Sequence, residues 1–390
     1  MIGAGTMGAG IAQVALEGGW DVTLFDSIGG ATDRARDRIR QGLTRRAEKA
    51  GEATPGSWTD ARLLRLTVAP SLAAAAAGAQ LVIEAALEDL ALKQALFTDL
   101  DAVTEPETIL ATNTSALSVS AIAERVGRPE RVVGLHFFNP APVLPLVEVV
   151  AGRRTAAWAA ERAAGIVEGW GKTPIRVTDS PGFIVNRVNR PFTLEPLRLL
   201  RSGAGTIETI DRALVAAGFP MGPFALMDLI GIDVNLAAAR GLFEALGRPP
   251  RFRPSPIQEQ LVAAGRLGRK TGEGFYQYAD GRATGPAARF AGEIPAGAGA
   301  PAALAPDAIA ERVILAIVNE AYRAAGDGVA SADDIDRAMR LGANHPFGPF
   351  EWAARTGVHE VVVMLDALSD EDADTFRPAL PLLREARAAM

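Results

Sequence analysis

The sequence predicts an α/β doubly wound domain followed by two related all-α domains. Strand-like apolar runs alternate with segments of helical spacing over residues 1–179, the pattern of a parallel sheet covered by helices. From Ser180 onward the strand pattern disappears and amphipathic helical spacing takes over. Within this second part, IDRALVAAGFPMGPFALMDLIGI (210–232) aligns with IDRAMRLGANHPFGPFEWAARTGV (335–358), which indicates an internal repeat.

Each element of the first part carries its own signal. A helix over 11–20 follows a glycine loop, and VTLFD (22–26) predicts a buried strand that ends in an acid. Further apolar runs, typical of strands in parallel sheets, cover 66–70, 80–86, 107–115 (strand, then loop), 131–138, 144–150 and 173–179. Helical spacing marks 30–50, 89–103, 116–126 and 156–171.

We expect four segments along the chain. A dinucleotide-binding domain covers 1–179, an all-α domain 180–281, and a second all-α copy 307–390. Between the two copies, 282–306 is dominated by Ala, Gly and Pro, a composition typical of a linker.

Composition narrows the possible functions. The 390 residues carry a net charge of −6 without a basic block, which argues against a nucleic-acid or membrane surface. No apolar run reaches the about 18 residues of a membrane span, and no signal peptide is evident. The chain has no Cys, which excludes thiol catalysis and Cys-ligated metals; we expect a cytoplasmic protein without a metal site.

The chain begins MIGAGTMGAGIAQ, in which Gly3, Gly5 and Gly8 form a G-x-G-x-x-G motif around Thr6 and Met7. In a Rossmann-type βαβ unit this loop places the pyrophosphate at a helix N-terminus. Asp26 closes the next strand, where a carboxylate binds the adenosine ribose and repels a 2′-phosphate, so NAD is favoured over NADP. The alternatives are a chance run of glycines and an aspartate that only caps a turn.

His136 and Glu148 are the candidates for acid–base chemistry. His136 ends the strand GLHFF, and Glu148 is a charged residue inside the apolar strand LPLVEVV, where it needs a partner. A strand–loop–strand connection could bring them together at the carboxyl end of the sheet, so that the carboxylate orients an imidazole base. The alternative is a structural histidine beside an edge-strand glutamate.

Ser115 and Asn186 are polar residues near the ends of elements, where such residues more often cap helices than bind substrates. His345 and His359 lie in the second helical copy, and we expect neither to be catalytic.

Taken together, the chain resembles the L-3-hydroxyacyl-CoA dehydrogenase family, which includes 3-hydroxybutyryl-CoA and 3-hydroxyadipyl-CoA dehydrogenases. The resemblance covers nearly the whole chain. It rests on GAGTMGAGIAQ, VTLFD, VIEAALEDLALKQALF, ILATNTSALSVSAIA, GLHFFNPAPVLPLVEVV, DSPGFIVNR, GFPMGPFALMDLIG and GRKTGEGFY.

The resemblance implies NAD-dependent oxidation of (S)-3-hydroxyacyl-CoA to 3-oxoacyl-CoA, with His136 as the base and Glu148 as its orienting partner. Ser115, Asn186 and Asn139 would bind the substrate, and Lys49 would lie near the CoA moiety. The cofactor residues implied are Gly3, Gly5, Thr6, Met7, Gly8, Asp26, Glu88, Lys93 and Asn113. Without the resemblance, Glu88 and Lys93 read as exposed helix charges.

The chain departs from the family pattern in two places. The second helical copy has Glu311 opposite Asn186 and thus lacks the substrate asparagine; we expect it to be structural, as in a pseudo-dimer, and a homodimer stays open. The family has a full apolar strand before the glycine loop, whereas only Met1 and Ile2 stand here. We expect the first strand to be truncated, the loop to lose its anchor, and the true start to lie upstream.

Two other functions stay open. A 3-hydroxyadipyl-CoA-specific enzyme would need an Arg at the far end of its acyl pocket, which the sequence does not single out. A non-catalytic NAD-binding relative is the alternative if the first strand is absent. Lysine-based β-hydroxyacid dehydrogenases fit less well, because no Lys stands where their catalytic group would be.

Overall fold

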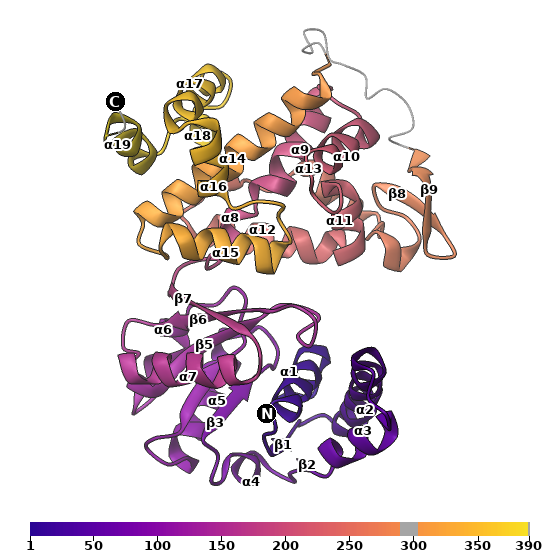
Figure 1. Cartoon of the computed structure of the whole chain (residues 1–390), viewed down its shortest axis with the longest axis vertical. Helices are drawn as coiled ribbons and strands as arrows, with labels where there is room; N and C mark the ends of the chain where they lie inside the picture. Colours follow the sequence, from indigo (N-terminus) through magenta and orange to yellow (C-terminus); the bar gives the residue numbers. More distant parts are fainter. Residues whose placement is uncertain (289–302, 389–390) are drawn as a thin grey trace. The chain divides into compact units, whose positions relative to one another are not determined.

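The computed structural model describes residues 1–288 and 303–388, which belong to two compact units, Met1–Phe183 and Ile184–Met390 (Figure 1). Both helical copies expected from the sequence therefore belong to one unit. In the described part of the chain, no helix is long and apolar enough to cross a bilayer.

The first unit alternates strands and helices, as the sequence predicts. Its strands are β1 (Val22–Leu24), β2 (Leu66–Val68), β3 (Leu81–Glu84), β4 (Ile109–Thr112), β5 (Val132–Phe137), β6 (Leu146–Ala151) and β7 (Thr173–Thr178). Its helices are α1 (Thr6–Glu17), α2 (Ala31–Ala50), α3 (Pro55–Leu63), α4 (Leu72–Ala76), α5 (Leu90–Val103), α6 (Val119–Ile122) and α7 (Ala157–Gly169), with short 3-10 turns at Ala123–Arg125 and Pro129–Arg131. Helices α3 and α4 have no counterpart among the expected elements.

The strands form two sheets. Strands β1 and β2 pair in parallel, and the other five lie in the order β3-β4-β5-β6-β7. Strand β6 pairs with β5 in the antiparallel sense, so the sheet is mixed rather than fully parallel. The reason is the connection over 138–145, because a parallel return needs a crossover of a dozen or more residues.

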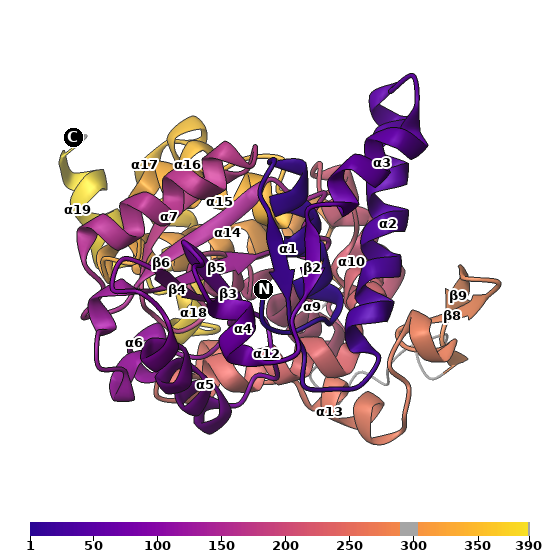
Figure 2. The same ribbon diagram turned by 90° about the horizontal axis from the view of Figure 1, so that it is seen from below.

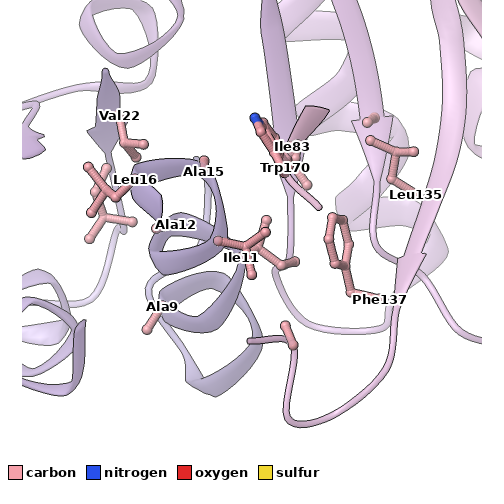
Figure 3. Packing of buried hydrophobic residues seen from close by; sticks show 14 of the residues in the cluster. Ala9, Ile11, Ala12, Ala15, Leu16, Val22, Ile83, Leu135, Phe137 and Trp170 are labelled. Atoms are coloured by element: carbon pink, nitrogen blue, oxygen red, sulfur yellow. The ribbon is translucent and has the colours of Figure 1, made fainter. Parts of the chain in front are cut away.

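The main core lies between α1, α7 and one face of the larger sheet. Alternate residues of β5, such as Leu135 and Phe137, join this core, whereas His136 points to the opposite face. Figure 3 shows Ile11 of α1 pointing toward Ile83 and Phe137. On its other side α1 contacts α2, and the two helices lie side by side in Figure 2.

The backbone of Ile2 connects the two sheets. It bridges Phe25, just after β1, and Glu84 at the end of β3, and the amide of Gly3 donates to the Phe25 carbonyl at 2.8 Å. The expectation that the glycine loop lacks an anchor is therefore wrong. Beside Met1, a cavity of about 500 Å³ lies between β1 and β3, lined also by Trp20 and Trp170.

The second unit is helical apart from one β-hairpin, whose first strand, Tyr276–Ala279, lies in the segment 180–281 that was expected to be all-α. Its first helices are α8 (Val185–Val188), α9 (Pro191–Ser202), α10 (Ile207–Ala216), α11 (Pro223–Ile230), α12 (Ile232–Ala245) and α13 (Pro256–Ala263), with 3-10 turns at Pro250–Phe252 and Arg269–Thr271. They are followed by α14 (Pro306–Gly326), α15 (Ala332–Ala343), α16 (Pro349–Thr356), α17 (Val358–Ser369), α18 (Ala373–Phe376) and α19 (Leu380–Ala388). Figure 1 shows the long helix α14 among its neighbours; it contacts α9, α10, α16 and α19.

The two aligned segments make the same local contacts. Asp211 of α10 accepts hydrogen bonds from the amides of Phe224 and Ala225, which open α11. Asp336 of α15 does the same for Phe350 and Glu351, which open α16.

Two ion pairs to fully buried glutamates join the two copies reciprocally. The guanidinium of Arg187 lies 2.7 Å from Glu320, and that of Arg312 lies 2.6 Å from Glu195. In the alignment, Arg312 and Glu320 stand where Arg187 and Glu195 stand in the first copy. Each copy thus gives its arginine to the glutamate of the other.

The expected linker, 282–306, begins with a strand. Strands β8 (Tyr276–Ala279) and β9 (Arg282–Pro286) form an antiparallel hairpin, so 282–286 pair with β8 instead of linking domains. Residues 289–302 of that segment lie outside the described residues.

Candidate active site

The glycine loop has the geometry of a phosphate-binding turn. Gly3 has a φ of +95°, and a Cβ there would lie 2.6 Å from the carbonyl oxygen of Ala85. A Cβ on Gly8 would lie 2.0 Å from the Gly3 carbonyl oxygen, so the helix could not begin so close to the loop. A Cβ on Gly5 would meet nothing within 4 Å, which leaves open space at the N-terminus of α1. Thr6 and Met7 form the first turn of that helix, whose amides suit an anion.

Asp26 follows β1 and is tied to the same loop. Its Oδ2 accepts from the amide of Ala4 at 2.7 Å, and its Oδ1 accepts from the amide of Ile28 at 2.8 Å. The carboxylate thus does cap a turn, and it also holds the glycine loop. Each oxygen keeps a second lone pair with which it can accept from a ribose hydroxyl.

His136 and Glu148 lie directly opposite each other on β5 and β6. Nδ1 of the imidazole is 2.6 Å from Oε2 of the carboxylate, and the two residues are 6% and 0% exposed. Their expected proximity is confirmed, but Glu148 lies within an antiparallel strand and not at a carboxyl end. The rings of Phe138 and Phe183 lie 4.5 and 5.7 Å from the imidazole centroid. With Nδ1 held, Nε2 is the nitrogen that can exchange a proton with a ligand.

The loop after β4 carries the next candidates. Asn113 accepts from the amide of Phe137 through Oδ1 at 2.9 Å, directly beside His136, and donates its own amide to the carbonyl of Glu84 at 2.8 Å. The amide of Ser115 donates to Oε1 of Glu88 at 3.0 Å. The structure therefore places the Asn113–Ser115 loop next to the strand that holds the histidine.

Lys93 is not an exposed helix charge, contrary to what its sequence pattern suggests without the family; Glu88 is 38% exposed but lies just before α5 and not within it. Lys93 is 1% exposed, and its ammonium lies 2.6 Å from Glu84 and 3.3 Å from Glu88. Burial alone would raise the pKa of Glu88, but the Thr114 hydroxyl, the Lys93 ammonium and backbone amides together hold it below its usual range. Sequence reasoning missed Glu84, whose signal is an acid inside the apolar run QLVIEAA.

A second residue that sequence reasoning missed is Lys172. Its ammonium donates to the carbonyls of Ala141 and Leu144 at 2.6 and 2.9 Å, and burial lowers its pKa. These carbonyls belong to the loop between His136 and Glu148. Lys172 therefore fixes the connection that pairs the two strands.

The other candidates belong to other elements. Asn139 is exposed in the loop after β5, and Lys49 is exposed in the last turn of α2. Asn186 is half-buried in α8 of the second unit. In the described part of the chain, no group of His, Asp and Glu could hold a metal ion.

Comparisons with known proteins identify the family of the chain. Residues 1–180 match the NAD binding domain of 3-hydroxyacyl-CoA dehydrogenases, and residues 182–278 and 309–389 match the C-terminal domain. The chain belongs to the 3-hydroxyacyl-CoA dehydrogenase family.

Three relatives illustrate the family. A 3-hydroxyadipyl-CoA dehydrogenase of Escherichia coli is 40% identical over 99% of this chain and 96% of its own. A 3-hydroxybutyryl-CoA dehydrogenase of Mycobacterium tuberculosis is 41% identical, over 71% of this chain and 97% of its own. The crystal structure of a 3-hydroxybutyryl-CoA dehydrogenase from E. coli K12 has a TM-score of 0.89 and 37% identity, and the match covers 100% of this chain and 98% of the other.

As a member of this family, the chain has an NAD-binding first domain, and its residues fit the cofactor. The open space at Gly5 and the helix N-terminus suit the pyrophosphate, and Asp26 suits the adenosine ribose. The buried imidazole–carboxylate pair can accept or donate one proton.

Proposed function

We propose that this protein oxidises (S)-3-hydroxyacyl-CoA to 3-oxoacyl-CoA, with His136 as general base and Glu148 as its partner. The observation that carries the proposal is the 2.6 Å contact between these two buried side chains, in a chain of the dehydrogenase family. A buried glutamate opposite a histidine is costly unless it serves the imidazole.

The roles of the two residues follow from the contact. When bound, NAD⁺ supplies the acceptor for the hydride that leaves C3 of the substrate. Nε2 of His136 takes the hydroxyl proton from the same carbon, and Glu148 stabilises the imidazolium through Nδ1. In the reverse direction His136 returns that proton as an acid.

The remaining site residues bind the cofactor or the substrate. In this proposal Gly3, Gly5, Thr6, Met7, Gly8 and Asp26 hold the adenosine and pyrophosphate half of NAD. Glu88, Lys93 and Asn113 line the nicotinamide half, as the family resemblance implies. Ser115, Asn139 and Asn186 bind the substrate near its 3-oxygen and thioester, and Lys49 lies near the CoA moiety.

The names of the relatives point to two classes of acyl group for the substrate. The relatives that match this chain over almost its whole length are named for a six-carbon dicarboxylyl-CoA in one case and for a four-carbon acyl-CoA in the other. We propose general short-chain activity first, with 3-hydroxyadipyl-CoA as the alternative substrate.

The C-terminal helices 306–388 form a structural repeat of the first copy. The reciprocal pairs Arg187–Glu320 and Arg312–Glu195 support this reading, since each copy meets the other as one subunit of a dimer meets its partner. The mycobacterial relative matches 71% of this chain yet 97% of its own, which also supports an added copy here. The cytoplasm remains the expected location.

Oxidation of NADH by the purified protein with acetoacetyl-CoA tests the function. We expect turnover that His136→Gln lowers by about 10²-fold or more, because general base catalysis contributes this much. NADH binding without turnover of any acyl-CoA from C4 to C16, or of the 3-oxoadipyl thioester, would instead indicate a non-catalytic NAD-binding protein.

A further inference from the structure

A buried lysine lies between two carboxylates at the end of β3. Lys93 and Glu84 are 1% and 0% exposed in their side chains, and their charged atoms lie 2.6 Å apart. Glu88, which is 38% exposed, lies 3.3 Å from the same ammonium. Burying a lysine is costly unless partners compensate it, so this arrangement has to serve a neighbouring group or the fold itself.

Glu84 is the fixed end of the arrangement. Its Oε1 accepts from the amide of Ala86 as well as from Lys93, both at 2.6 Å. Its Oε2 accepts from the hydroxyl of Thr112 at 2.8 Å. Thr112 is the residue of β4 that pairs with Glu84 of β3. Held at both oxygens by parts of the sheet, Glu84 fixes the position of the Lys93 ammonium.

Glu88 connects the fixed Lys93 ammonium to the loop after β4. Its Oε2 faces Lys93, while its Oε1 accepts from the Thr114 hydroxyl and from the amides of Ser115 and Ala116. One carboxylate oxygen thus accepts three donors from consecutive residues of the loop. The lowered pKa of Glu88 agrees with this set of donors.

We propose that Glu88, held by Lys93 and Glu84, is a positioning residue for Ser115. The carboxylate fixes the backbone that presents the Ser115 hydroxyl, and the Lys93 ammonium is neutralised by two carboxylates within the protein. The inference rests on the proposed function of Ser115 as a substrate-binding group. This role is separate from the contact with the nicotinamide half of NAD that the family resemblance implies for Glu88 and Lys93, and the two roles can coexist.

A double-mutant cycle separates these two roles. We expect Glu88→Ala to lower kcat with acetoacetyl-CoA by about tenfold. In a Ser115→Ala background, the same change should lower kcat by less than about twofold, because the group being positioned is gone. Glu88→Gln keeps an oxygen in place for the loop and should retain most of the rate; Glu124→Ala, an exposed acid, is the matched control.

A role of Glu88 in cofactor binding alone gives a different pattern. Glu88→Ala would then raise the KM for NADH about tenfold, and its effect would persist undiminished in the Ser115→Ala background. That result overturns the inference.

Amide hydrogen exchange gives a readout that needs no turnover. The amides of Ser115 and Ala116 should exchange at least about tenfold faster in Glu88→Ala than in wild type, and Glu124→Ala should leave them unchanged. Unchanged protection in Glu88→Ala overturns the inference whether or not the wild-type protein oxidises NADH. Absent turnover in the wild type bears on the proposed function alone.

Discussion

Nδ1 of His136 and Oε2 of Glu148 are 2.6 Å apart, and the two residues are direct partners across the antiparallel pair β5–β6. The contact therefore depends on strand register. A slip of one residue would turn one side chain to the opposite face of the sheet and separate the pair. Lys172 opposes such a slip, because it ties down the loop between the two strands.

Replacing Glu148 by glutamine tests what the carboxylate does for the imidazole. The amide oxygen of the Glu148→Gln variant can still accept from Nδ1, but a neutral amide cannot stabilise the charge that His136 acquires. We expect kcat to fall by about 10² to 10⁴-fold with little change in the KM for either substrate. Steady-state kinetics with acetoacetyl-CoA and NADH measure this, with thermal unfolding as the control for folding. Near-normal turnover would remove Glu148 from the mechanism.

Replacing Asp26 by Ala tests the cofactor preference. The carboxylate follows β1 and accepts from the amides of Ala4 and Ile28, so its loss loosens the glycine loop and, in the proposed function, removes a ribose acceptor. We expect the KM for NADH to rise about tenfold and the preference for NADH over NADPH to narrow. The ratio of kcat/KM for the two cofactors reports the change. A ratio equal to that of the wild type would mean that Asp26 only caps the turn.

The reciprocal ion pairs predict a large stability effect in the second unit. Arg312→Met leaves the fully buried Glu195 with Arg198, at 2.8 Å, as its remaining charge partner among the described residues. We expect a loss of about 3 kcal/mol of unfolding free energy, the lower end for a broken buried pair, measured by urea denaturation. Arg240→Met breaks an exposed pair with Glu259 and should leave the midpoint unchanged. Equal midpoints for the two variants would contradict the prediction.

His345 predicts a loss of stability in mild acid. Its Nε2 lies 2.8 Å from Oδ1 of Asn189, its Nδ1 has no hydrogen-bond partner among the described residues, and burial lowers its pKa to about 3. The unfolded chain binds a proton below the ordinary pKa of about 6.5, whereas the folded protein does so only near 3, so folding weakens as pH falls through that window.

The test compares unfolding free energies at pH 7 and pH 5. His345→Gln cannot titrate and should lose about 2 kcal/mol less than the wild type over this range. His359→Gln, a change at an exposed histidine, should follow the wild type. A His345→Gln variant as acid-sensitive as the wild type would exclude His345 as the cause.

The sequence predicted local elements better than their placement. The glycine loop, β1 with Asp26, and the strands of His136 and Glu148 follow from apolar runs and motif spacing. The reversal of β6 was open to prediction, because the connection after His136 is too short for a crossover. The burial of Lys93 could not be predicted, because it depends on the contact with Glu84, which lies on a separate element. In the sequence alone, Glu84 is simply an acid within an apolar run.

The helical part shows the same limit. The repeat is visible in the aligned residues, yet nothing local says that Arg187 pairs with Glu320 across copies. Strand β9 was also missed, because Arg282–Pro286 lies at the start of a segment whose composition is that of a linker. Pairing with β8 overrode the weak strand preference of Gly and Pro.

The arrangement of the two sheets in the first unit implies that a bound cofactor also stabilises the fold. Asp26 follows the two-stranded sheet, whereas Asn113 and His136 belong to the five-stranded one, and the backbone of Ile2 bridges the two beside a cavity of about 500 Å³. A dinucleotide that binds both halves would act as a brace between them. Because such a ligand binds the folded state alone, NAD⁺ at 100 times its Kd would add about 2.7 kcal/mol to the stability of this unit.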